Sequence, residues 1–196
     1  MPASKPLIIL ASSSVWRRQL LRQINLRFEA TSPDIDESAT EGEASHALAC
    51  RLAQTKAEKV AQAWPEAIVI GCDQVADVDG RILGKPGTHA RAREQLRLQS
   101  GKTVVFHTGL CVCAPNFKAP RLHLETVTTH FRDLDDAEIA RYVAAEDVTA
   151  TAGSLKSEGL GITLVSAIES KDPSALVGLP LIGLRSLLAD AGVALP

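Results

Sequence analysis

Four charged residues in the first half of the chain, two acids and two lysines, are of types that can bind ligands or take part in catalysis. Asp73 follows the apolar run AIVIGC, and Glu37 ends the acidic segment DIDE. Carboxylates in such places can bind a divalent metal ion or accept a proton from water. Lys56 and Lys85 can neutralise charge on phosphoryl oxygens. Each residue alone is more often a solvated surface charge, but together the four are candidates for a functional site.

A serine-rich turn, Ser12 to Ser14, separates the apolar run PLIILA from a helical pattern. Backbone amides at the start of a helix bind anions, and serine hydroxyls add further donors. Arg17 lies one turn into the expected helix. The same residues are also consistent with an ordinary serine N-cap and a plain helix start. With that alternative open, Ser12, Ser14 and Arg17 are candidate phosphate ligands.

Short apolar runs alternate with amphipathic segments, which is typical of a mixed α/β fold. Strands are predicted at residues 6–11, 28–31, 67–78, 82–83, 103–114, 121–132 and 162–168. Helices are predicted from the serine turn to residue 24 and over residues 45–64, 88–99, 135–145 and 181–191, with a glycine loop at 153–159. The dipeptide Asp79-Gly80 is a strong hairpin signal, so the returning strand should bring Lys85 towards Asp73.

The length of 196 residues predicts one domain spanning 1–196. A net charge of -2, without a run of Lys or Arg, argues against a protein that binds duplex nucleic acid. The chain has no export signal and no apolar run long enough to cross a membrane, which predicts a cytoplasmic protein. Its four cysteines lack paired spacing and are expected to be reduced and buried; for Cys72, beside Asp73, oxidation sensitivity is the alternative.

Several short motifs occur in an order and spacing that resemble the Maf-like nucleotide pyrophosphatase family. They are ASSSVWRRQLL, DIDE, LAQTKAEK, GCDQV and GKP, followed by GSLKSEGLGI and DPSALVGLPLIGL. The similarity covers nearly the whole chain, and the agreement of several rare motifs in order is specific. It implies a fold like that of the inosine triphosphatases, with two lobes around a mixed sheet and a deep central cleft. It also implies a homodimer that releases pyrophosphate from nucleoside triphosphates with Mg²⁺ or Mn²⁺.

The resemblance assigns roles to residues at matching positions. Asp73 matches the proton acceptor of the family, and Asp73 and Glu37 match the carboxylates expected to hold the metal ion. Glu37, together with Lys56 and Lys85, also matches the other polar residues of the family's cleft. The phosphate cradle then consists of Ser12, Ser14 and Arg17.

Within this family, Trp16, Gln74 and Glu158 resemble the branch that hydrolyses 7-methyl-GTP. The branch acting on thymidine and uridine triphosphates instead has Arg and Thr at positions 16 and 74. Methylation at N7 makes guanine cationic, and an indole face attracts a flat cation better than a neutral base. Glu158 can pair with the N1 and N2 donors of guanine. Without the motif context, Trp16 is also consistent with a core residue of an amphipathic helix.

Two alternatives to this function stay open. Catalysis can be retained with thymidine triphosphate, uridine triphosphate or another modified nucleotide as substrate. The chain can also be a nucleotide-binding regulator of cell division that does not hydrolyse its ligand. The acids favour an enzyme, because carboxylates near phosphates repel them unless a metal ion intervenes.

Overall fold

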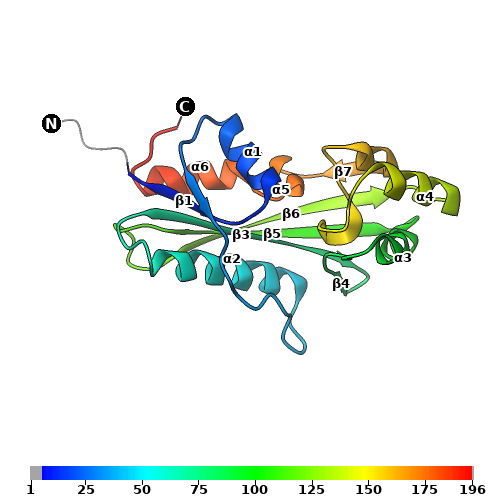
Figure 1. The fold of residues 1–196 in the computed structure, drawn as a ribbon, viewed down its shortest axis with the longest axis horizontal. Helices are drawn as coiled ribbons and strands as arrows, with labels where there is room; N and C mark the ends of the chain where they lie inside the picture. Colours follow the sequence, from blue (N-terminus) through cyan, green and yellow to red (C-terminus); the bar gives the residue numbers. More distant parts are fainter. Residues whose placement is uncertain (1–5, 196) are drawn as a thin grey trace.

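The computed structural model describes residues 6–195, and its centre is a seven-stranded mixed sheet (Figure 1). The strand order is β2-β1-β3-β5-β6-β7, and β4 pairs with β3 beside this path. β1 pairs in parallel with β2 and β3, and the other pairs are antiparallel. The strands are β1 (Ile8–Ala11), β2 (Glu29–Thr31), β3 (Ile68–Val78), β4 (Arg81–Leu83), β5 (Thr103–Cys113), β6 (Arg121–Phe131) and β7 (Val165–Glu169). The mixed α/β class is confirmed.

Helices cover both faces of the sheet (Figure 1). They are α1 (Val15–Gln23), α2 (Ser45–Ala61), α3 (His89–Gln99), α4 (Asp136–Ala145), α5 (Ser174–Val177) and α6 (Leu181–Asp190), with short 3-10 helices η1 (Ala152–Ser154) and η2 (Leu160–Leu164). Successive strand residues point to opposite faces. Leu10 and Ile70 therefore pack in the cluster that includes α1 and α6, whereas Ile9 and Val69 pack in the cluster that includes α2.

Two strand glycines let α2 approach the sheet closely. A Cβ atom on Gly71 of β3 would collide with the backbone oxygen of Ala53, and one on Gly109 of β5 would collide with that of Ala49. The alanines on this side of α2 complete the close contact. As a result, the side chain of Lys56 on α2 reaches β3 directly.

The edge of β3 that faces β1 and β4 contains a gap. β1 pairs with β3 as far as Gly71, and β4 begins to pair at Ala76. Among the described strands, none pairs with residues 72–75 on that side, because the chain turns away from the sheet after Ala11. Asp73 lies in this gap, where no described strand covers the edge of β3, and its side chain projects from the face of the sheet that α2 covers.

The predicted elements match the structure, with three differences. The predicted strand 162–168 is partly wrong: η2 occupies its first half, and β7 begins only at Val165. A Cβ on Gly161 would collide with the backbone of Lys156, so this glycine permits a tight turn where the apolar pattern indicated a strand. The second predicted helix ends at Ala61 instead of residue 64, because the chain before Pro65 closes in turns. The short helix α5 was not predicted.

The thiols agree only in part with the sequence-based expectation, because Cys72 and Cys111 are buried but Cys50 and Cys113 are only half-buried. All four cysteines are free, and Cys72 is fully buried. Burial raises the pKa of the Cys72 thiol to about 11, which keeps it protonated and unreactive. This confirms the buried-thiol interpretation of Cys72. Within residues 6–195, no helix is both long and apolar enough to cross a membrane.

Candidate active site

A cleft of about 790 Å³ opens at the gap in β3. Its walls come from the serine turn and the start of α1, the segment between β2 and α2, and the inner face of α2. The segments around residues 82–85, 147–156 and 177–178 complete it. Of the ten candidate site residues, nine line this cleft: Ser12, Ser14, Trp16, Arg17, Glu37, Lys56, Asp73, Gln74 and Lys85. Residues up to 73 positions apart in the chain therefore meet at one site.

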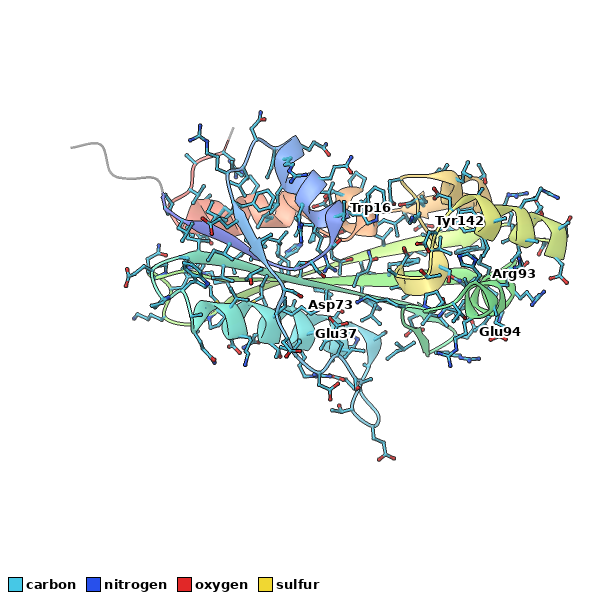
Figure 2. All side chains as sticks on the ribbon, in the orientation of Figure 1. Trp16, Glu37, Asp73, Arg93, Glu94 and Tyr142 are labelled. Atoms are coloured by element: carbon cyan, nitrogen blue, oxygen red, sulfur yellow. The ribbon has the colours of Figure 1, made fainter. Side chains whose placement is uncertain are left out.

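Lys56 is the centre of an ion-pair network at the base of the cleft. Its side chain is buried, and its Nζ lies 2.5 Å from Asp73 Oδ1 and 2.6 Å from Glu37 Oε1. Glu37 also accepts from Lys85, whose Nζ lies 3.1 Å from Oε2. Figure 2 shows Asp73 and Glu37 side by side, one on β3 and the other on the segment before α2. A buried ammonium group needs such partners, since burying an unpaired charge is strongly unfavourable.

The hairpin brings Lys85 into the same cleft as Asp73, as predicted, but its ion-pair partner is Glu37. Asp73 instead pairs directly with Lys56. The order of contacts is therefore Asp73, Lys56, Glu37, Lys85. Because Lys56 holds Oδ1, Oδ2 is the Asp73 oxygen that remains to accept a proton or bind a cation.

Glu37 is kept ionised by its two lysine partners. Burial alone would raise the pKa of its carboxyl, but hydrogen bonds and charge from Lys56, with a contribution from Lys85, hold the pKa below its ordinary value. The segment that carries Glu37 is anchored by Arg51 of α2. Arg51 donates from Nε and Nη2 to the two carboxylate oxygens of Glu43 at 2.6 and 2.7 Å, and from Nη2 to the carbonyl of Ser38 at 3.0 Å.

The serine turn is both a helix cap and a set of polar groups facing the cleft. Ser14 caps α1 by accepting from the Arg17 amide at 3.4 Å. Ser12 Oγ accepts from the Ser14 amide at 3.1 Å and from Arg17 Nη1 at 3.3 Å. Arg17 Nε donates to the carbonyl of Gly178 at 2.8 Å, which fixes the guanidinium against the loop after α5. The capping interpretation is therefore confirmed. The hydroxyl hydrogens of Ser12 and Ser14 and the Nη2 group of Arg17 are not used in these bonds and can donate to an anion.

Trp16, at the first turn of α1, meets a lysine that the sequence did not single out. The Nζ of Lys156 lies 5.4 Å from the centre of the Trp16 ring, within the range of a cation–π contact. Both residues line the cleft. Lys156 lies in the quoted motif GSLKSEGLGI, which was the only sequence signal that could have drawn attention to it.

Gln74 and Glu158, the other two residues assigned to base selection, are placed differently from each other. Gln74 lines the cleft, but its Nε2 donates to the backbone carbonyls of Ala175 and Leu176 at 2.8 and 3.0 Å. Only its Oε1 is left to meet a ligand, as an acceptor. Glu158 is exposed as a residue and is absent from the cleft wall. Partial burial of its carboxyl nevertheless raises its pKa.

The carboxylates fit a divalent cation that is held jointly with a substrate. Mg²⁺ is commonly bound by one or two carboxylates, water and substrate phosphates. Asp73 and Glu37 supply two carboxylates, and both contact the ammonium group of Lys56. In the part of the chain that the structure describes, no three His, Cys, Asp or Glu side chains are grouped as a complete metal site. The donor set therefore fits a cation shared with phosphates better than a cation held by protein alone.

Comparisons with known proteins agree with the motifs. A family model described as Maf-like protein matches residues 7–191. The chain is 52% identical over 191 residues to a 7-methyl-GTP pyrophosphatase of Xanthomonas axonopodis pv. citri, covering 97% of this chain and 100% of that protein. It is 50% identical to the 7-methyl-GTP pyrophosphatase of Methylobacillus flagellatus, covering 96% and 98%. A solved structure, the Staphylococcus aureus Ham1 protein, is 19% identical over 64% of this chain and 72% of that chain, with a TM-score of 0.46. The chain belongs to the family of Maf-like proteins.

Proposed function

We propose that this protein is a nucleotide pyrophosphatase that hydrolyses 7-methyl-GTP to 7-methyl-GMP and pyrophosphate, and so removes a modified nucleotide from the pool. The single observation that carries the proposal is the Asp73, Lys56, Glu37 and Lys85 network at the base of a cleft whose far wall holds Trp16. Relatives at 50–52% identity over nearly their whole length bear that name.

The mechanism uses the free oxygen of Asp73. Asp73 Oδ2 accepts a proton from water as that water attacks the α-phosphorus, and the bond to the bridging oxygen breaks to release pyrophosphate. Lys56 holds Asp73 in place through Oδ1. The serine turn donates hydrogen bonds to the phosphoryl oxygens, and Arg17 and Lys85 neutralise their negative charge.

A divalent cation, Mg²⁺ or Mn²⁺, would be held by Asp73 with Glu37 beside it. Such an ion activates water and stabilises charge on the phosphates when it is bound. Each Glu37 oxygen already accepts from a lysine, so Glu37 also orients Lys56 and Lys85.

Base selection rests on Trp16, Gln74 and Glu158. The indole face of Trp16 suits a cationic methylated guanine. Gln74 offers Oε1 as an acceptor to a base donor. Glu158 would need to turn towards the cleft to pair with guanine, because it is absent from the cleft wall.

The remaining features of the proposal concern the whole protein. We propose a single domain over residues 1–196, a homodimer and a cytoplasmic location, where reduced thiols such as buried Cys72 are stable. Its partner is a small-molecule nucleotide. Duplex nucleic acid does not suit a chain with a net charge of -2.

A side-by-side nucleotide panel tests the proposal. Pyrophosphate release would be measured with 7-methyl-GTP, GTP, thymidine triphosphate and uridine triphosphate, with Mg²⁺ or Mn²⁺ and with a chelator. The highest kcat/KM is expected for 7-methyl-GTP with metal. A preference for thymidine or uridine triphosphate would move the chain to the other branch, and no release from any nucleotide would favour the binding regulator.

Trp16→Arg tests the specificity assignment within the same panel. Arginine is the residue of the thymidine and uridine branch at this position, and it replaces the indole face by a positive charge that repels a cationic base. The preference for 7-methyl-GTP over GTP should fall by about tenfold. An unchanged ranking of substrates would remove Trp16 from the specificity argument.

A further inference from the structure

Lys156 differs from the other two lysines of the cleft in forming no ion pair, although its charge acts on the nearby carboxylates of Asp147 and Glu158. Lys56 and Lys85 both form ion pairs with carboxylates. Among residues 6–195, no carboxylate oxygen lies within 4 Å of Lys156 Nζ. Its recorded contact is the face of Trp16, at 5.4 Å. A cation–π contact of this kind is weak and can be exchanged for a better partner.

The backbone of Lys156 is held firmly, so a change of partner involves the side chain alone. The Lys156 amide donates to the hydroxyl of buried Tyr142 at 3.0 Å, and that hydroxyl donates to the carbonyl of Ser154 at 3.2 Å. Gln99 donates to the neighbouring carbonyl of Gly153 at 2.8 Å. In contrast, the flexible four-carbon stem of a lysine allows its ammonium group to move between sites.

The ammonium group of Lys156 occupies a surface that a nucleotide base needs. Trp16 lines the same cleft as the candidate phosphate cradle of Ser12, Ser14 and Arg17. A base that stacks on the cleft side of Trp16 must displace the ammonium group. A nucleoside offers the displaced lysine no anion, whereas a triphosphate does, so displacement is more favourable for the triphosphate.

We propose that Lys156 is a specificity-determining residue that couples base binding to triphosphate binding. In the free protein its ammonium group rests on Trp16, and when a base stacks there the group transfers to the phosphates. The cleft thereby rejects ligands that carry a base without a phosphate chain. This inference rests on the proposed function, in that the cleft takes a purine nucleotide with its base on Trp16.

Binding of two ligands to Lys156→Met tests the coupling. The probes are 7-methylguanosine and the α,β-methylene analogue of 7-methyl-GTP, which cannot be cleaved between its α and β phosphates. Both are titrated against Trp16 fluorescence in a Trp64→Phe background, since Trp64 lies outside the cleft wall. Slightly acidic buffer keeps the methylated base cationic.

The expected effects on the two ligands have opposite signs. Lys156→Met should bind the nucleoside about fivefold more tightly, because nothing has to leave Trp16. It should bind the triphosphate analogue about tenfold more weakly, because a charge-assisted contact is lost. Lys156→Arg, which keeps a cation, should change both affinities by less than about threefold. Lys171→Met removes the same charge outside the cleft and should change neither.

Other patterns would overturn the inference. If Lys156→Met weakens both ligands, the lysine merely supports the site, and if it strengthens both, the lysine merely obstructs it. No change in either also excludes the coupling. Lys156→Gln is measured in parallel, so that the result does not depend on one variant folding well.

The test is separable from the proposed function because it measures binding without turnover. If the wild-type protein hydrolyses 7-methyl-GTP but the opposite changes in affinity are absent, the inference fails and the enzyme assignment stands. If no nucleotide is hydrolysed but the opposite changes are present, the coupling stands and the enzyme assignment fails.

Discussion

At one end of the cleft, Asp73 and Lys56 project from β3 and α2, two elements packed in contact through Gly71 and the alanines of α2. At the other end, Trp16 projects from the first turn of α1 and meets Lys156 from a segment between helices. The first pair is buried and joined at 2.5 Å, whereas the second is a weak contact at 5.4 Å. The comparison indicates that the reacting groups are fixed by close packing and short ion pairs, whereas the recognition groups meet through a weak contact that a side chain can exchange for another partner.

The largest effect is expected for Asp73→Asn, which removes the proton acceptor at the catalytic end of the cleft. The amide cannot accept the proton from water, so kcat should fall by about a thousandfold. Binding of 7-methylguanosine at Trp16 should stay within about threefold, since that end of the cleft is independent. Pyrophosphate release and Trp16 fluorescence measure the two effects, with thermal unfolding as the control for folding. Near-wild-type turnover would show that Asp73 is not the base.

Lys56→Met and Lys85→Met separate the buried lysine from the exposed one. Removing Lys56 leaves two carboxylates facing each other, so the free energy of unfolding should fall by about 3 kcal/mol. Removing Lys85, whose side chain is 58% exposed, should change it by less than about 1 kcal/mol. Urea unfolding monitored by circular dichroism measures both. Equal effects would mean that the base of the cleft is no more rigid than its rim.

Gln74→Met tests whether Gln74 belongs with the recognition groups of the cleft or with its reacting groups. Methionine keeps the volume of glutamine but removes the donor to the carbonyl of Leu176, whereas the carbonyl of Ala175 still accepts from Thr108 and from the Gly178 amide. We expect a loss of about 1–2 kcal/mol in the free energy of unfolding and a rise of a few fold in KM, with kcat nearly unchanged. Thermal unfolding and steady-state kinetics report these values. A fall in kcat with an unchanged KM would place Gln74 with the reacting groups instead.

Acidification tests the anchor of the segment that carries Glu37. Hydrogen bonds from Arg51 lower the pKa of Glu43 from 4.5 to about 2. A folded-state pKa below the unfolded value favours the ionised form, so the contribution of this pair is present above pH 4.5 and is lost as the pH falls towards about 2. The stability difference between wild type and Glu43→Gln should shrink over that window. A difference independent of pH would exclude the ion pair as its source.

Much of the fold could be predicted from local patterns. The long strands β3, β5 and β6 and the capped helices α1, α3 and α4 carry strong signals in periodicity and end residues, and the structure contains them. The start of β7 was misplaced, because Gly161 allows a tight turn within an apolar segment. The four-residue helix α5 was missed because its position depends on hydrogen bonds from Gln74 and Thr108, far away in the chain.

The sequence by itself determined which groups can bind a ligand or react with it: the carboxylates and lysines, the serine turn, and Trp16 next to Arg17. Residue types and short spacings are local, and local patterns are what a sequence displays directly. Only the tertiary structure decided which groups meet. It paired Lys56 with Asp73 and Lys85 with Glu37, left Glu158 off the cleft wall and brought Lys156 onto Trp16. Those contacts depend on the gap in β3 and the close packing of α2, which arise only when distant segments pack together.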